Sequence, residues 1–246
     1  MTRRQFSAFA GGTVAALFSG ACAGTGAAPV ISDRITAKHK VSRTTAKGED
    51  RLGLDSRDAI LRVPKNAPDG PLPLLVLLHG AGGSGANMLG RISSYCDDAG
   101  LAVLSPTSRG GTWDGIRGEI GVDVEFINRA LTKTFDVVNV NPRKIILGGF
   151  SDGASYALSL GLINGDYFNK IVAFSPGFIV GGEMHGKARI FISHGTRDPI
   201  LPIDRCSRVI VPALKRQNFD VTYTEFNGVH EITPDVAREA LTWAAS

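Results

Sequence analysis

The sequence predicts an α/β fold in which helices cover both faces of a mostly parallel central sheet. Two patterns favour this fold. Short, continuous apolar runs alternate along the chain with longer segments whose apolar residues recur at helical spacing. The run Leu-Leu-Val-Leu-Leu at residues 74–78 has no polar face, which is typical of a strand buried on both sides in a parallel sheet. Because strands and helices follow one another in this order, the connecting helices are expected to pack on the sheet.

The expected elements follow from these patterns in chain order. The strands are expected within residues 34–63, most clearly at 58–63, and then at 74–78, 101–104, 144–148, 170–174, 188–193 and 221–226. The helices are expected at residues 86–98, 122–135, 154–162, 204–217 and 234–245. Glycine and proline predict a turn at 65–73 and a loop at 105–121. Asp204 and Thr233 are the expected N-caps of the last two helices.

Composition indicates a single domain, expected over residues 34–246. The chain has 246 residues, of which 43% are hydrophobic, and this is enough to bury one sizeable core. The net charge is only +4 and no basic stretch has interleaved aromatic residues, so no nucleic-acid partner is expected. Cys22, Cys96 and Cys206 lack the spacing of metal ligands, and the sequence leaves open whether Cys96 and Cys206 pair or remain separate buried thiols.

Residues 1–23 resemble an export signal, followed by a linker expected at 24–33. Arg3 and Arg4 precede an apolar run that is shorter than the about 20 residues of a membrane span. The paired arginines resemble the twin-arginine export motif. We therefore expect an exported protein that is periplasmic, secreted or lipid-anchored in the bacterial cell envelope.

The end of this signal allows two interpretations. Ser-Gly-Ala-Cys at residues 19–22 resembles a lipobox, which makes Cys22 a lipidation candidate, although serine stands where leucine is usual. The small residues at 21–23 instead favour ordinary cleavage. Membrane contact is expected only through a lipid anchor on Cys22.

The most informative stretch is Gly-Phe-Ser-Asp-Gly at residues 149–153, which fits the pattern G-x-S-x-G. It lies between an expected strand and an expected helix, the context that a nucleophile elbow requires. So tight a turn brings Gly149 and Gly153 close together, where a Cβ atom would clash. Ser151 would stand exposed at the head of a helix, whose N-terminal amides favour a developing negative charge.

A serine nucleophile requires a base and a third group that orients the base. The chain order for a serine on such an elbow is serine, acid, histidine. His230 is the one histidine beyond Asp198, and it follows the last expected strand. Asp198 follows the strand before it and would hold the imidazole tautomer. Asp204 is the alternative acid, although it is also the expected helix cap.

Acyl transfer also requires donors for an oxyanion. One expected donor is the backbone amide of Asp152, the residue after the nucleophile. The other is expected from the glycine-rich loop His-Gly-Ala-Gly-Gly at residues 79–83, with the amide of Ala81 as first choice and Gly80 or Gly82 as alternatives. This loop lacks the Lys-Ser/Thr ending of a phosphate-binding loop, and the chain has no HExxH or paired-cysteine motif. No cofactor or metal is therefore expected.

Four motifs occur in this order: residues 79–83, 149–153, 194–199 followed by Pro202, and 228–230. On these motifs the chain from about Ile60 onward resembles the α/β-hydrolase fold. It most resembles the phospholipase/carboxylesterase family and the related secreted polyhydroxybutyrate depolymerases and feruloyl esterases. The resemblance implies a cofactor-free serine esterase with Ser151, Asp198 and His230 as catalytic triad.

The substrate is less well defined than the chemistry. Residues 175–187 are too few for a substantial lid, so minimal or no cap is expected and lipase activity on long chains is disfavoured. Trp113, Phe178, Ile200 and Val229 are candidates for an apolar substrate pocket, with ordinary packing as the alternative for each.

The expected function is therefore an exported serine carboxylesterase acting on a small-molecule or polymeric ester. A peptidase or thioesterase with the same triad is one alternative. A noncatalytic envelope binding protein on a hydrolase scaffold is another.

Overall fold

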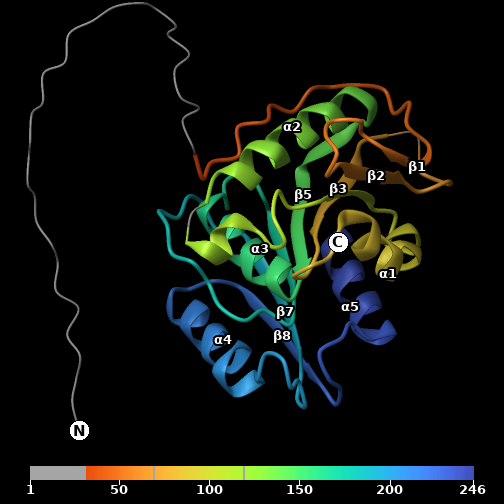
Figure 1. The fold of residues 1–246 in the computed structure, drawn as a ribbon. Coiled ribbons are helices and arrows are strands. Elements are labelled where there is room, and N and C mark those ends of the chain that lie inside the picture. The colour runs from red at the N-terminus through yellow and green to blue at the C-terminus, as the bar shows by residue number, and fades with distance from the viewer. Residues whose placement is uncertain (1–31, 69, 119) are drawn as a thin grey trace, which may run out of the picture. The chain divides into compact units, whose positions relative to one another are not determined.

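The structure is a computed structural model that describes residues 32–68, 70–118 and 120–246. The expected export signal, Cys22 and most of the expected linker lie outside the described residues. An eight-stranded sheet has the strand order β1-β2-β4-β3-β5-β6-β7-β8 (Figure 1).

The strands are β1 (Gly48–Arg51), β2 (Ala59–Val63), β3 (Leu72–Leu78), β4 (Ala102–Pro106), β5 (Val140–Phe150), β6 (Lys170–Phe174), β7 (Arg189–Gly195) and β8 (Val221–Phe226). The α-helices are α1 (Gly85–Asp98), α2 (Val122–Val137), α3 (Asp152–Ile163), α4 (Ser207–Arg216) and α5 (Pro234–Ala245). Two short 3-10 helices are η1 (Asp114–Arg117) and η2 (Ile203–Arg205).

The sheet is parallel except at one edge. Strands β4, β3, β5, β6, β7 and β8 pair with their neighbours in parallel, whereas β2 runs antiparallel to both β1 and β4. The mostly parallel sheet predicted from the sequence is confirmed. The carboxyl ends of its parallel strands lie side by side, and ligands bind at these strand ends on sheets of this kind.

Alternate residues of the central strands pack into two apolar cores, one on each face of the sheet. On β3, Leu74, Val76 and Leu78 belong to the core that includes α2, α3 and α4. Leu75 and Leu77 belong to the core that includes α1 and α5. Figure 1 shows the same arrangement, with α2 and α3 on one side of the sheet and α1 and α5 on the other. The continuous apolar run of β3 is thus buried on both faces, as predicted.

Most helices and strands begin and end close to their predicted positions. The bounds of β6, β8 and α5 agree with the prediction, and the Thr233 hydroxyl accepts a hydrogen bond from the Val236 amide at 3.4 Å as N-cap of α5. The prediction for α4 is wrong at its start. The helix begins at Ser207, and Asp204 lies in η2, where its carboxylate binds Arg208 at 2.7 Å instead of capping α4.

The segment at residues 32–47 is extended but forms no strand. Side chains of the helical layer hold its backbone in place. The Thr36 amide donates to Asn128 Oδ1 at 2.7 Å, and the Ile35 amide donates to Asn164 Oδ1 at 2.8 Å. The early strands expected within residues 34–63 are therefore β1 and β2 alone.

The loop between β6 and β7, residues 175–187, contains no helix and forms no cap domain. Two serines of α3 hold it along the helix. Ser155 Oγ accepts the Gly177 amide at 2.9 Å, and Ser159 Oγ accepts the Val180 amide at 2.8 Å. The expectation of a minimal cap is confirmed.

Both cysteines in the described residues are free and buried. Burial raises the pKa of the Cys96 thiol to about 12 and also raises the pKa of Cys206. Two separate thiols are thus found, rather than a disulfide. Among the helices of the described ranges, none combines the length and apolar character that crossing a membrane requires.

Candidate active site

Ser151 occupies the sharp turn between β5 and α3. Its backbone angles, φ 58° and ψ −121°, lie outside the favoured regions for a residue with a side chain, so the turn is strained. A Cβ atom at Gly149 would overlap the Gly153 carbonyl, and one at Gly153 would overlap the Leu78 carbonyl. The Ser151 amide donates to the Phe174 carbonyl at 2.9 Å, which ties the turn to β6. The two glycines are therefore required by space, as the sequence indicated.

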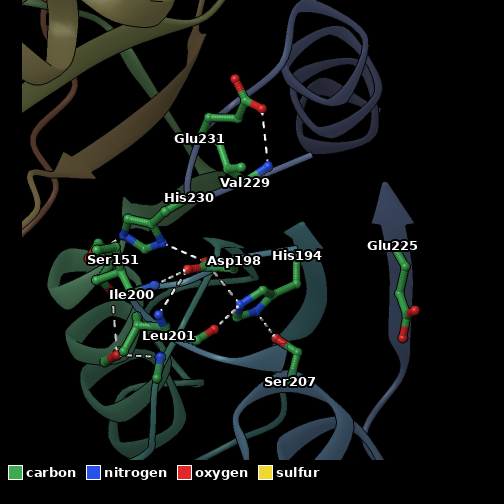
Figure 2. A network of polar contacts seen from close by, with 12 residues as sticks. Ser151, His194, Asp198, Ile200, Leu201, Ser207, Glu225, Val229, His230 and Glu231 are labelled. Carbon is green, nitrogen blue, oxygen red and sulfur yellow. Dashed lines mark hydrogen bonds and ion pairs between the residues drawn. The ribbon is translucent and has the colours of Figure 1, made fainter. Parts of the chain in front are cut away.

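Ser151, His230 and Asp198 form a continuous line of polar contacts (Figure 2). His230 Nε2 lies 2.8 Å from Ser151 Oγ, and His230 Nδ1 lies 2.6 Å from Asp198 Oδ2. An ionised carboxylate can only accept, so Nδ1 carries the proton and Nε2 is free to accept the serine hydroxyl. The structure thus brings together the three side chains that the sequence proposed as a triad.

Asp198 is buried and fully hydrogen-bonded. Its Oδ1 accepts the amides of Ile200 and Leu201 at 2.9 and 2.8 Å, while Oδ2 binds His230. Burial by itself would raise the pKa of Asp198. The amides of Leu201 and Ile200 together with His230 outweigh that effect, so the pKa is held below its usual value. The carboxylate is therefore ionised at neutral pH.

Backbone contacts between two loops place His230 beside Asp198. The Arg197 amide donates to the Gly228 carbonyl at 2.9 Å. A Cβ atom on Gly195 would overlap the backbone of Gly228 and Val229, so the loops after β7 and β8 meet in direct contact. This approach joins segments that are far apart in sequence.

Two other carboxylates, those of Asp204 and Asp152, point elsewhere. Asp204 is engaged with Arg208 on the surface. The side chain of Asp152, next to the nucleophile, accepts a hydrogen bond from the Thr112 hydroxyl at 2.7 Å. Neither contacts His230, so Asp198 is the carboxylate that orients this imidazole.

Three of the backbone amides considered as oxyanion donors have no partner in the described part of the chain. The amides of Gly80, Ala81 and Asp152 donate to no residue that the structure describes. The Gly82 amide donates to the Gly111 carbonyl at 2.7 Å, so this alternative to Ala81 is wrong. The Asp152 amide is also the first of α3, where the helix dipole favours negative charge.

The glycine-rich loop lies directly against the nucleophile. A Cβ atom on Gly80 would lie 3.3 Å from Ser151 Cβ. Below the loop, the buried His79 ring has Nδ1 2.7 Å from the Gly80 carbonyl and Nε2 3.0 Å from the Ser108 amide. The Ser108 amide can only donate, so Nε2 accepts and Nδ1–H donates to Gly80. His79 is thus a neutral structural residue beneath the loop.

Over residues 115–244 the chain matches the model of the phospholipase/carboxylesterase family, and this span contains Ser151, Asp198 and His230. The chain belongs to the phospholipase/carboxylesterase family. This membership and the α/β-hydrolase fold place it among serine hydrolases of the carboxylesterase type.

The chain is also similar to two proteins in sequence and to a third in fold. The chain is 26% identical over 199 residues to acyl-protein thioesterase 1 of Saccharomyces cerevisiae, covering 65% of this chain and 86% of the yeast protein. It is 25% identical over 146 residues to NocK of Nocardia uniformis subsp. tsuyamanensis, a protein assigned as an esterase, covering 55% of this chain and 42% of NocK. The chain therefore spans less than half of the length of NocK.

The third is a solved structure. S-formylglutathione hydrolase FrmB of Staphylococcus aureus superposes with a TM-score of 0.66 at 17% identity, covering 85% of this chain and all of FrmB (100%). At this identity the likeness concerns the fold alone.

In this member of the phospholipase/carboxylesterase family, Trp113 does not line a substrate pocket. Its side chain is 0% exposed, stacks on Tyr156 with ring centroids 5.3 Å apart, and donates Nε1–H to the His79 carbonyl at 2.8 Å. The sequence interpretation of Trp113 as a substrate-binding residue is therefore wrong. Trp113 instead supports the glycine-rich loop from below.

A cavity of about 240 Å³ lies beside the glycine-rich loop. Its lining includes Gly80 and Ala81 of the loop, Asn87 and Arg91 of α1, and Phe150, whose ring is 4.8 Å from the His230 ring. Sequence analysis missed Asn87 and Arg91. The two residues are four apart on a helix that begins just after the loop. This spacing places them on the same face of the helix and is the signal that could have found them.

The remaining candidates for substrate contact are surface residues. Phe178, Ile200 and Val229 have exposed fractions of 40%, 66% and 45%, and none lines the cavity beside the glycine-rich loop. Ile200 and Val229 are close in sequence to Asp198 and His230, at the open edge of the site. Their contact with substrate stays a prediction.

Proposed function

We propose that this protein is an exported serine carboxylesterase with Ser151 as nucleophile, His230 as general base and acid, and Asp198 as the group that orients the base. The observation that carries the proposal is the contact line of 2.8 Å from Ser151 Oγ to His230 Nε2 and 2.6 Å from His230 Nδ1 to Asp198. The strained backbone of Ser151 supports it, because such strain persists where the surrounding structure enforces it and clusters at active sites.

In the first half-reaction Ser151 Oγ attacks the ester carbonyl carbon while its proton passes to His230 Nε2. The carbonyl oxygen becomes an oxyanion that accepts hydrogen bonds from the amides of Ala81 and Asp152. The intermediate then collapses, the alcohol leaves with the proton from His230, and an acyl ester remains on Ser151.

In the second half-reaction a water molecule attacks this acyl ester while His230 Nε2 takes its proton. Collapse of the second intermediate returns that proton to Ser151 Oγ and releases the carboxylic acid. Asp198 stays ionised throughout, holds Nδ1–H in place and stabilises the imidazolium that forms twice in the cycle.

The cavity beside the glycine-rich loop favours a small substrate group. Its volume of about 240 Å³ is below the about 300–1,000 Å³ of pockets that hold drug-sized ligands. Hydrogen bonds to Ser155 and Ser159 hold residues 175–187 against α3, and this segment forms no helical lid over the site. A short acyl or alcohol group fits this arrangement better than a long lipid chain.

The test uses p-nitrophenyl acetate with the wild type and Ser151→Ala. We expect kcat to fall by at least about 10⁴-fold and the thermal midpoint to stay nearly unchanged. Ser94→Ala on the exposed side of α1 is the matched control and should keep full activity. Undiminished turnover in Ser151→Ala would refute the assignment.

A fluorophosphonate probe separates an enzyme from a noncatalytic binding protein. An activated Ser151 should become phosphonylated in the wild type and remain unlabelled in Ser151→Ala. If the folded wild type does not label, the noncatalytic interpretation is favoured.

A thioesterase is the second candidate, because the chain is similar to acyl-protein thioesterase 1 over 199 residues. Phenyl acetate and S-phenyl thioacetate differ only in the leaving atom. We expect a higher kcat/KM for the oxygen ester. A clear preference for the thioester, beyond its greater intrinsic reactivity in solution, would replace carboxylesterase with thioesterase.

Export is proposed from the sequence of residues 1–23. Expression of the full chain in a bacterium, followed by intact-mass measurement of the envelope fraction, distinguishes the two alternatives. A mass that includes an acylated Cys22 indicates a lipoprotein, and cleavage after Ala23 indicates an ordinary signal. An uncleaved cytoplasmic chain would contradict both.

A further inference from the structure

The carboxylate of Asp198 has a second imidazole neighbour. His194 Nε2 lies 3.2 Å from Asp198 Oδ2, the oxygen that also binds His230 Nδ1 at 2.6 Å. On its other side, His194 Nδ1 lies 2.7 Å from Ser207 Oγ. Figure 2 shows the resulting line of contacts, which runs from Ser207 through His194, Asp198 and His230 to Ser151. Both Ser207 and His194 are 0% exposed.

The neighbours of His194 determine where its proton lies. Nε2 faces two acceptors, Asp198 Oδ2 and the Leu201 carbonyl at 2.8 Å, so Nε2 carries a hydrogen. Burial lowers the pKa of His194, which favours the neutral ring. A neutral ring with Nε2–H has a bare Nδ1, and this atom accepts the hydroxyl proton of Ser207.

We propose that His194 and Ser207 form a buried pair of positioning residues that fixes Asp198 for its work on His230. The inference rests on the proposed function. The pair has the residue types of a second triad on the same carboxylate, but the connections are reversed, because Ser207 meets Nδ1 and the acid meets Nε2. Ser207 is also sealed from solvent, so it has no route to a substrate.

The pair supports the surroundings of one carboxylate. Asp198 Oδ1 accepts the amides of Ile200 and Leu201, and Oδ2 binds Nδ1 of His230. His194 Nε2–H donates to the Leu201 carbonyl at 2.8 Å and has Oδ2 as a second, longer neighbour at 3.2 Å. His194 thus holds the backbone of Leu201, whose amide binds Oδ1, and places a polarised N–H beside Oδ2.

The other charged groups near His194 have partners of their own. Glu225 lies opposite His194 in the register of β7 and β8, and its carboxylate binds the Arg208 guanidinium at 2.6 Å. The Cys206 thiol near Asp198 has a raised pKa, because of burial and then of the Asp198 charge, and is neutral. Asp198 is thus the acid that lies beside His194 Nε2, at 3.2 Å, and His230 is the cation that this acid stabilises during turnover.

The test compares His194→Phe, His194→Gln and Ser207→Ala by the pH dependence of kcat/KM for p-nitrophenyl acetate. Phenylalanine removes the donor, and Asp198 Oδ2 then becomes more basic and stabilises the His230 imidazolium more strongly. We expect about a tenfold fall in kcat at neutral pH and an acid limb that moves to higher pH. Glutamine keeps an N–H near the Nε2 position, so His194→Gln should restore most of the kcat and most of the position of the acid limb. Ser207→Ala should give a smaller shift of the acid limb in the same direction.

Thr134→Val is the control for loss of a buried hydroxyl, because Thr134 bonds only within α2, to the Ala130 carbonyl at 2.8 Å. It should lower the thermal midpoint and leave the acid limb in place. A purely structural role of His194 would give the same result in His194→Phe and His194→Gln, and an unmoved acid limb in folded variants would overturn the proposal. Failure of the proposed function is distinct, because it appears as an active Ser151→Ala.

A measurement on the wild type keeps the inference testable if His194→Phe does not fold. In protein labelled with 15N-histidine, His194 should show the neutral Nε2–H tautomer at neutral pH and donate across a hydrogen bond at Nε2. An Nδ1–H tautomer, or a charged ring at neutral pH, would overturn the proposal.

Discussion

The indole Nε1–H of Trp113 donates a hydrogen bond to the carbonyl oxygen of His79 at 2.8 Å. The His79 ring in turn binds the Gly80 carbonyl and the Ser108 amide. Three hydrogen bonds therefore hold the end of β3 and the start of the glycine-rich loop in place. This support sets the position of the Ala81 amide, the proposed oxyanion donor.

Removal of the indole donor should impair turnover more than substrate binding. Trp113→Phe keeps an aromatic ring against Tyr156 but leaves the buried His79 carbonyl without its partner. We expect about a tenfold lower kcat, a nearly constant KM and a loss of about 1–3 kcal/mol in the free energy of unfolding. Trp243→Phe is the matched control, because the buried Nε1 of Trp243 has no partner among the described residues. Equal kcat values in the two variants would contradict this role for Trp113.

Neutralising the proposed triad acid should separate it from its alternative in the sequence. Asp198→Asn leaves a side chain of the same shape but can hold His230 in the wrong tautomer, so kcat should fall by about 10⁴-fold. Asp204→Asn breaks only a surface contact with Arg208 and should leave kcat unchanged. Steady-state hydrolysis of p-nitrophenyl acetate measures both, and an active Asp198→Asn would exclude Asp198 as the orienting acid.

A methyl group on Gly80 should disturb the nucleophile without preventing folding. The added Cβ would lie 3.3 Å from Ser151 Cβ, so the loop or the serine must move by a few tenths of an ångström. We expect kcat/KM to fall by up to about 100-fold, because small displacements at reacting atoms are costly. Gly90→Ala on α1 meets no atom within 4 Å and should be active and slightly more stable. A fully active Gly80→Ala would show that the loop is not confined against Ser151.

Two buried histidines should make the fold sensitive to mild acid. Burial lowers the pKa of His79 and of His194 in the folded state, below the value of about 6.5 of an exposed histidine. The unfolded chain therefore binds more protons as the pH falls through this value, and stability declines with it. The lowered pKa of Asp198 adds a further loss at lower pH, below about 4.

Denaturant unfolding between pH 8 and pH 5 measures this effect. The free energy of unfolding of the wild type should fall over the interval, and His194→Gln should show a weaker pH dependence because glutamine does not titrate. A constant free energy of unfolding from pH 8 to pH 5 would contradict the buried, neutral state of both rings.

Much of the fold was predictable because the local patterns were strong. The residues of β6 after Lys170 are all apolar, those of β8 alternate, and Thr233 precedes α5 as a hydroxyl cap, so pattern and structure agree there. The three side chains of the contact line were found from the elbow and from chain order. Their catalytic roles stay a prediction that the variants above test.

The rest depends on contacts between distant segments. Asp204 has the residue type of an N-cap, but its bond to Arg208 and the start of α4 at Ser207 depend on local packing. Trp113 lies in the loop expected at residues 105–121, and only the folded chain brings it onto Tyr156. The link between Asp198 and His194 has no sequence signal beyond the spacing of the two residues.

The two sulfhydryl groups of the described chain lie inside the protein and are too far from ionisation at neutral pH to exchange. Maturation of this domain should therefore proceed equally in reducing cytosol and in an oxidising envelope, without help from a disulfide-forming catalyst. Export in the folded state would suit such a molecule, because its described part has no disulfide that must form after the protein crosses the membrane.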